Sequence, residues 1–164
     1  MNLKVRLHTC EQLDNLSLSG KVLKETLDSL RFINSFLGNH KQLSDAVLNY
    51  CKTLPPAKKN HIIDIGCGGG DCIFYIYKKL KKHKINASFT GIDGNLQSIT
   101  YARDNNPNPA NINFYSADVI DTNFVLPDCD ILISSHFMYH FSDNDLSEFL
   151  KKIKPKKVID LSVL

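Results

Sequence analysis

Apolar side chains recur at intervals of three and four residues in the first third of the chain. The residues that show this spacing are Val22, Leu23, Thr26, Leu27, Leu30, Ile33 and Leu37. They predict an amphipathic helix over residues 21–37 that stops near Gly38 and Asn39, and a second helix from about residue 44 to 53. The following "LPPAKKN" interrupts helical structure, because consecutive prolines cannot continue a helix. Residues 1–54 are therefore expected to form a helical arm that precedes a main body at 58–164.

After this break, short apolar runs alternate with stretches of helical periodicity. The runs are "HIIDI", "ASFTGID", "NINFYSAD", "DILISS" and "KVIDLSV". They show little alternation of apolar and polar residues, which is typical of strands that are covered on both faces. The pattern predicts an α/β fold with a mostly parallel sheet, in which ligands bind at the carboxyl ends of the strands.

Four glycines within five positions follow the first predicted strand and precede a helix: Gly66, Gly68, Gly69 and Gly70. Glycine is costly to order, so this turn must be tight and its backbone must approach a ligand closely. A dinucleotide-binding turn would have a further glycine where Asp71 stands. Asp71 is favoured as the N-cap of the helix, and its carboxylate would repel a pyrophosphate. A ligand without pyrophosphate fits better, while a nucleotide-linked oxidoreductase remains the alternative.

Three motifs in succession resemble those of class I S-adenosylmethionine-dependent methyltransferases. They are "DIGCGGG" at 64–70, "FTGID" ending at Asp93, and "SAD" ending at Asp118. The resemblance implies a Rossmann-like methyltransferase sheet, S-adenosylmethionine as cofactor and S-adenosylhomocysteine as product. The preceding arm is loosely similar to that of small-molecule methyltransferases of the ubiquinone/menaquinone type and of enzymes beside polyketide synthases. It would form an N-terminal helical lid, with Arg31, Asn34 and Asn39 facing the site.

The resemblance also implies which residues bind the cofactor. Asp93 would accept hydrogen bonds from the ribose hydroxyls and Asp118 from the adenine amino group. The amino group of the methionine part would reach the main chain at Gly66 and the carboxylate of Asp64. The full expected set is Asp64, Gly66, Cys67, Gly68, Asp93, Gly94, Asp118, Val119 and Ser135.

The segment after the fourth strand, "ISSHFMYHFSDNDLSEFLKK", carries the candidates for catalysis. His136 and His140 are the expected bases for an acceptor that must lose a proton, because histidine titrates near neutrality. No metal is expected, since Phe137 stands where a zinc-binding His-Glu-x-x-His motif has its glutamate. Ser142 with Asp145 predicts a helix start that is similar to a capping box.

Composition narrows the class of protein further. The five cysteines form no Cys-x-x-Cys pair and are expected to be reduced and buried. The net charge of +3 is spread over several segments, and the Asn/Asp-Pro-Pro-Tyr/Phe motif of nucleobase methyltransferases is missing after the fourth strand. No nucleic-acid partner is therefore expected, and the similarity of the arm to that of small-molecule methyltransferases implies a small-molecule acceptor. Without a signal peptide or a long apolar run, we expect a cytoplasmic protein with no membrane span.

The strand count adds one more expectation. Domains of this family have seven strands in the order 3-2-1-4-5-7-6, and the sequence predicts five. The last two strands are thus expected to be missing, which would leave the edge of the fifth strand uncovered. The favoured explanation is a C-terminally truncated fragment, and the alternative is that a second copy covers this edge in a homodimer. A non-catalytic cofactor-binding module stays open as an alternative, and so do the acceptor and whether methylation is on O, N or C.

Overall fold

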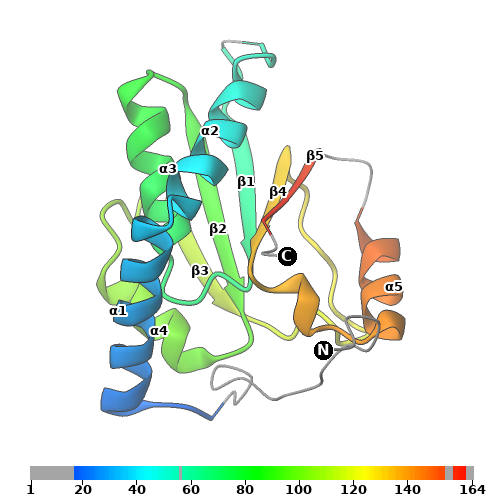
Figure 1. Cartoon of the computed structure of the whole chain (residues 1–164). Coiled ribbons are helices and arrows are strands. Elements are labelled where there is room, and N and C mark those ends of the chain that lie inside the picture. Colours follow the sequence, from blue (N-terminus) through cyan, green and yellow to red (C-terminus); the bar gives the residue numbers. More distant parts are fainter. Residues whose placement is uncertain (1–16, 56, 154–156, 162–164) are drawn as a thin grey trace, which may run out of the picture.

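A parallel sheet of five strands forms the centre of the molecule (Figure 1). The computed structural model describes residues 17–55, 57–153 and 157–161. The strands are β1 (Asn60–Ile65), β2 (Ala87–Asp93), β3 (Ile112–Ser116), β4 (Ile131–Ser135) and β5 (Lys157–Leu161), in the order β3-β2-β1-β4-β5. All four neighbouring pairs are parallel, so the predicted fold class and the order of the first five strands are confirmed.

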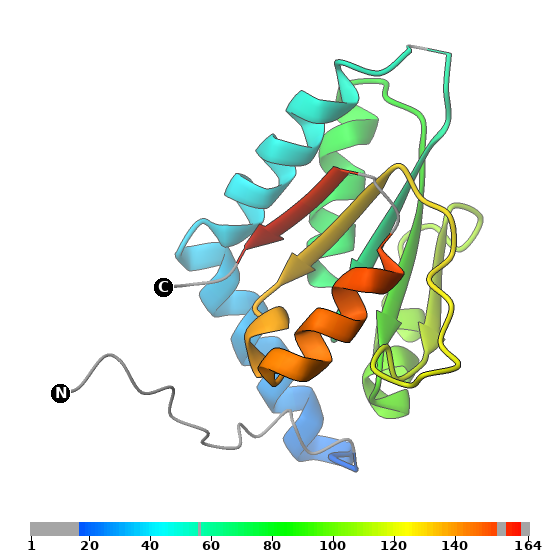
Figure 2. The same cartoon turned by 90° about the vertical axis from the view of Figure 1, so that its right-hand side faces the viewer.

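Helices cover both faces of this sheet. The helices are α1 (Gly20–Phe36), α2 (Asn39–Cys51), α3 (Asp71–Lys82), α4 (Leu96–Asp104), the short 3-10 helix η2 (Met138–His140) and α5 (Asp143–Lys152). Figures 1 and 2 show α2, α3 and α4 on one face and α5 on the other. The fully buried Ile73 belongs to the apolar core under the first face and Phe149 to the core under the second. This three-layer arrangement explains why the strands are apolar on both sides.

The helix α2 begins at Asn39, so the predicted start near residue 44 was wrong. Gly38 has a φ of +80°, which turns the chain sharply between α1 and α2 without a longer loop. The polar stretch after it becomes helical because His40 and Leu43 are buried against the body of the protein. Tertiary packing therefore extends this helix beyond what its polar sequence predicts.

Two helix starts test the predicted caps. Ser142 is the N-cap of α5, where its Oγ accepts a hydrogen bond from the backbone N–H of Asp145 and donates one to its carboxylate, as the sequence predicted. The predicted cap at Asp71 was wrong by one residue. Gly70 is the N-cap of α3, and Asp71 is the first helical residue, whose carboxylate contacts His40 instead of the helix amides.

The cysteines behave as expected where the structure describes them. Cys51, Cys67, Cys72 and Cys129 are free and buried, while Cys10 lies outside the described residues. Among the described helices, none has both the length and the apolar character needed to cross a membrane.

Candidate active site

Two cavities open at the carboxyl ends of the strands, where the sheet order switches direction. The larger measures about 460 Å³ and the smaller about 230 Å³. Among the residues expected at the site, the larger cavity is lined by Asp93, Gly94, Asp118, Val119 and His140, and the smaller by Asp64, Cys67 and Ser135; Gly66, Gly68 and His136 line both. The fold thus brings all of these residues around two adjoining cavities.

The glycine turn is fixed to the neighbouring strand, and at Gly66 it leaves no room for a side chain. The backbone N–H groups of Gly66 and Cys67 both donate to the carbonyl of Ile92, at 2.9 and 3.2 Å. Gly66 has a φ of +68°, and a Cβ there would lie only 2.2 Å from the ring of Phe137. Gly66 therefore allows the turn to pass directly beneath the loop that follows β4.

A different requirement holds for the glycines deeper in the structure. A Cβ on Gly70 would lie 2.7 Å from the ring of Phe114, and one on Gly91 in β2 would lie 2.5 Å from the same ring. These two glycines make room for one buried aromatic side chain beneath the turn.

Asp93, the last residue of β2, shapes the floor of the larger cavity. Its Oδ2 accepts a hydrogen bond from the N–H of Gly68 at 2.9 Å, and its Oδ1 accepts one from the N–H of Asn95 at 2.8 Å. Burial raises the pKa of Asp93, and the two amide hydrogen bonds oppose this effect. Because each carboxylate oxygen can accept two hydrogen bonds, both retain capacity for a ligand hydroxyl.

Asp64 lies in β1 beside the turn and is 2% exposed. Its Oδ1 has no hydrogen-bond partner among the described residues. Burial, and then the negative charges of Asp71 and Asp93, raise the pKa of Asp64 well above its usual value. A buried carboxylate without a cationic partner is costly, so this position favours a positively charged ligand group in the smaller cavity.

Asp118 follows β3 at the rim of the larger cavity. Its side chain is exposed, and its Oδ1 accepts a hydrogen bond from the N–H of Ile120 at 2.9 Å. This contact fixes the carboxylate in a turn while it remains accessible from the cavity. The neighbouring Val119 is buried and gives the cavity an apolar wall.

The arm covers the smaller cavity through α1 and the start of α2. Asn34 and Asn39 line it, as expected for a lid, whereas the exposed Arg31 interacts with Tyr101. Asn39 Nδ2 lies 3.0 Å from His136 Nε2 and 3.1 Å from Asn34 Oδ1. His136 itself has a φ of +54°, a backbone conformation that few residues with side chains adopt.

One contact between the arm and the body, from the buried His40 to the half-buried Asp71, was not predicted from the sequence. His40 Nε2 in α2 lies 2.6 Å from Asp71 Oδ2 in α3, and the His40 ring stacks on Tyr75. Ligand atoms of His40, Asp71 and Cys72 lie within 4.8 Å of one another, a grouping in which a cation could be held, but the hydrogen bond already accounts for the first two. The available signal was the spacing of His40 with Leu43 and Val47 on one helix face, which the late predicted start of α2 concealed.

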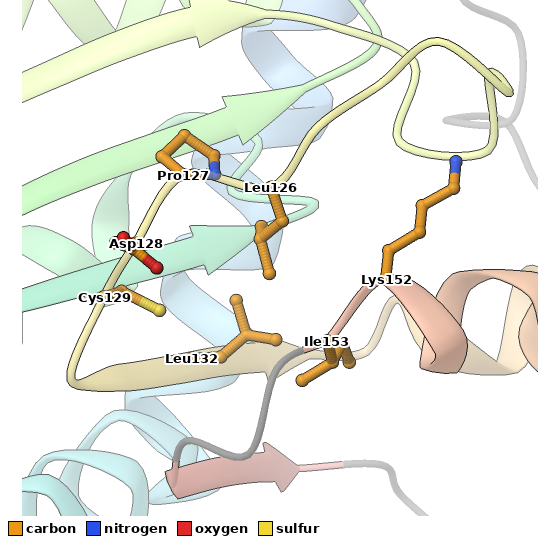
Figure 3. A pocket seen from close by; sticks show the side chains of 7 residues that line it. All are labelled: Leu126, Pro127, Asp128, Cys129, Leu132, Lys152 and Ile153. Atoms are coloured by element: carbon orange, nitrogen blue, oxygen red, sulfur yellow. The ribbon is translucent and has the colours of Figure 1, made fainter.

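A third hollow lies away from these residues, beneath α5 (Figure 3). Its volume is about 10 Å³, which is enough for one water molecule at most. Lys152 lines it and donates hydrogen bonds from Nζ to the carbonyls of Val119, Ile120 and Asp121 at 3.2, 3.3 and 2.5 Å. This hollow therefore belongs to the packing of α5 against the loop after β3.

Solved structures support the fold assignment. The plantazolicin methyltransferase BpumL in complex with SAH superposes with a TM-score of 0.62 at 21% identity, over 84% of this chain and 53% of BpumL. A Methanococcus maripaludis protein assigned as an S-adenosyl-L-methionine-dependent methyltransferase gives 0.61 at 16% identity, over 88% and 67% of the two chains. The citrinin polyketide synthase CMeT domain gives 0.61 at 15%, over 74% and 34%.

The chain thus spans about half the length of BpumL. A search of curated proteins found no match. The sequence profile of the family described as "Methyltransferase domain" matches residues 62–155, from β1 through α5, which is more than half of the 164 residues. With the parallel sheet, the glycine turn and the acidic strand ends, this match shows that the chain belongs to the methyltransferase domain family.

Proposed function

We propose that this chain binds S-adenosylmethionine and transfers its methyl group to a small molecule. The observation that carries the proposal is Asp64, a buried carboxylate beside the glycine turn whose Oδ1 has no hydrogen-bond partner in the described part of the chain. A cofactor that brings an ammonium group to this oxygen would relieve the cost of burying the charge. Asp93 at the end of β2 and Asp118 after β3 supply acceptors for a ribose and an adenine.

The two cavities suggest how the cofactor is divided between them. The larger cavity would hold the adenosyl part, with the ribose hydroxyls on Asp93 and the adenine between Asp118 and Val119. The smaller cavity would hold the methionine part, with its ammonium group on Asp64 and with Cys67 and Ser135 as walls. Gly66 and Gly68 line both cavities, so the glycine turn would pass beneath the junction of the two parts.

Methyl transfer from this cofactor requires of the protein mainly that it place the acceptor correctly. When bound, the cofactor supplies a methyl group on a sulfonium that already reacts readily. The residues of this chain would orient the acceptor in line with that methyl group and exclude water, which can provide much of the rate acceleration. His140, on the wall of the larger cavity, is the proposed base for an acceptor that must lose a proton, and His136 is proposed to orient it.

The acceptor is proposed to carry an apolar part next to a polar reacting group. Leu30 and Ile33 on α1 and Leu37 directly after it form one wall of the smaller cavity and are partly exposed to solvent. The polar side chains of Asn39 and His136 lie on another wall. The name of BpumL assigns it to plantazolicin, and the CMeT domain belongs to a polyketide synthase, so both are compatible with a small-molecule acceptor here. The arm of residues 1–54 would then act as the lid of this site.

Calorimetric titration tests the cofactor directly. S-Adenosylmethionine and S-adenosylhomocysteine are expected to bind and to raise the melting temperature, whereas NAD(H) is expected to do neither. Stabilisation by NAD(H) alone would instead support a nucleotide-linked oxidoreductase. Transfer of a labelled methyl group to a panel of hydroxyl, amine and activated-carbon acceptors then tests the activity. Cofactor binding without any transfer would support a non-catalytic module.

A further inference from the structure

A short hydrogen-bonded chain connects the arm to the end of β4. The carboxamide nitrogen of Asn39 lies 3.1 Å from Asn34 Oδ1 and 3.0 Å from His136 Nε2. A carboxamide nitrogen carries two hydrogens and accepts none, so Asn39 donates to both neighbours. His136 Nε2 must therefore be the unprotonated nitrogen of a neutral ring, and the proton must reside on Nδ1.

This tautomer matters for ligand binding because His136 lies where the two cavities meet. Among the described residues, four line both cavities, namely Leu27, Gly66, Gly68 and His136. His136 contributes the only polar side chain of these four. Its Nδ1 makes no hydrogen bond within the part of the chain that the structure describes.

We propose that Asn39 is a positioning residue that holds His136 as the Nδ1–H tautomer, so that His136 serves the junction of the two cavities as a hydrogen-bond donor and not as a base. Its Nε2 lone pair is already used by Asn39, so it cannot take a proton from the acceptor while this contact persists. The natural ligand group for the Nδ1–H is an oxygen of the acceptor or the carboxylate of the cofactor. His140 then remains the base. The donor role rests on the proposed methyl transfer, whereas the tautomer does not.

The tautomer can be measured without cofactor or turnover. Long-range ¹H–¹⁵N correlation spectra of the full chain distinguish Nδ1–H from Nε2–H rings, and comparison with His136→Asn identifies the signals among the six histidines. The expected result is an Nδ1–H ring for His136 near neutral pH. An Nε2–H ring would overturn the proposal, even if S-adenosylmethionine binds and methyl transfer occurs.

Two matched substitutions in the arm test whether Asn39 sets the tautomer of His136. Asn39→Asp removes the donor and offers only acceptor oxygens, so the proton of His136 is expected to move to Nε2. Asn34→Asp keeps an acceptor for Asn39 and is expected to leave the Nδ1–H ring in place. If Asn39→Asp leaves the tautomer unchanged while the protein stays folded, Asn39 does not set it and the proposal fails.

Two substitutions of His136 test whether its Nδ1–H acts as a hydrogen-bond donor. Asn carries its amide at the position of Nδ1 and tolerates a positive φ, whereas Gln carries its amide at the position of Nε2. His136→Asn is expected to retain most of the methyl transfer, and His136→Gln to lower kcat by about tenfold or more, the scale of one lost hydrogen bond to a charged or strongly polar group. Melting temperatures identify any variant that fails to fold. Folded variants with equal losses would overturn the donor role.

Discussion

Two aspartates, Asp64 in β1 and Asp130 directly before the adjacent β4, have opposite environments. Asp130 lies at the amino end of β4, where it contacts Lys58 Nζ at 2.5 Å and accepts a hydrogen bond from the N–H of His61 at 2.9 Å. Asp64 lies near the carboxyl end of β1, where its Oδ1 has no partner among the described residues. The protein itself satisfies the first carboxylate and leaves the second for a ligand. One end of the sheet is thus built for stability, and the other gives up stability for binding.

The largest effect is expected from a comparison of two histidines, His140 near the carboxyl ends of the strands and His61 near their amino ends. If His140 is the base, His140→Ala should lower turnover by about 10²–10⁴-fold and spare cofactor affinity. His61, at the amino end, hydrogen-bonds with the carbonyl of Asp128 and the hydroxyl of Thr90, so His61→Ala should lower the melting temperature and leave turnover per folded molecule unchanged. Steady-state kinetics and thermal unfolding measure both. Equal loss of cofactor affinity in His140→Ala would indicate a packing role.

The second largest effect is expected on cofactor affinity, from substitution of Asp93. Asp93→Ala should weaken S-adenosylmethionine binding by about 1.5–3 kcal/mol, the scale of hydrogen bonds to charged groups. The same substitution also frees the N–H of Gly68, which the carboxylate holds at 2.9 Å. Calorimetry on Asp93→Ala and Asp118→Ala compares the two acidic strand ends. An unchanged affinity would remove Asp93 from the site.

Asp130 should show the opposite behaviour. Asp130→Ala removes the partner of Lys58 and leaves the N–H of His61 unpaired, which should lower the free energy of unfolding by about 1–3 kcal/mol. Cofactor affinity should stay the same. Urea unfolding measures the stability of the variant and calorimetry its cofactor affinity. A variant that is as stable as the wild type but binds the cofactor poorly would contradict the division of the sheet into a stabilising end and a binding end.

The smallest effect is expected for Asp64 and depends on pH. Because the pKa of Asp64 is raised in the folded protein, that state keeps a proton which the unfolded chain has already lost. Asp64 therefore lowers stability as pH rises from its unfolded pKa, about 3.9, to the raised value. Asp64→Asn should remove this loss and raise the melting temperature of the cofactor-free protein by about 2–4 °C per kcal/mol. A variant that is less stable than the wild type at neutral pH would contradict this.

Cofactor binding should show the matching dependence. An ammonium group beside Asp64 favours the charged carboxylate, so binding releases a proton and affinity should rise with pH until the raised pKa is passed. Asp64→Asn should bind more weakly and should lose this part of the pH dependence. Titrations at several pH values measure it, and an unchanged pH profile in the variant would exclude Asp64 as the partner.

The sequence predicted the features that depend on local patterns. Apolar runs located the five strands, and the glycines located the turn that passes beneath Phe137. It did not predict the contacts of His40 with Asp71 or of Asn39 with His136, whose partners are 31 and 97 residues apart. Such pairs depend on how α2 docks onto the body, and the start of α2 was itself mistaken because packing, and not propensity, extends it.

The space that Gly70 and Gly91 leave for Phe114 has an evolutionary consequence. Selection at Gly91 acts through the size of an internal ring, and at Gly70 through this ring together with a φ of +78°. At Gly68 a Cβ would meet, among the described residues, only Leu27 at 3.6 Å, so selection there acts through backbone shape and the ligand. Descendants that no longer bind the cofactor would therefore retain Gly70 and Gly91 for as long as they retain Phe114. The aspartates at the strand ends would be substituted first. We expect alignments of such descendants to retain part of the glycine motif as a relic of packing.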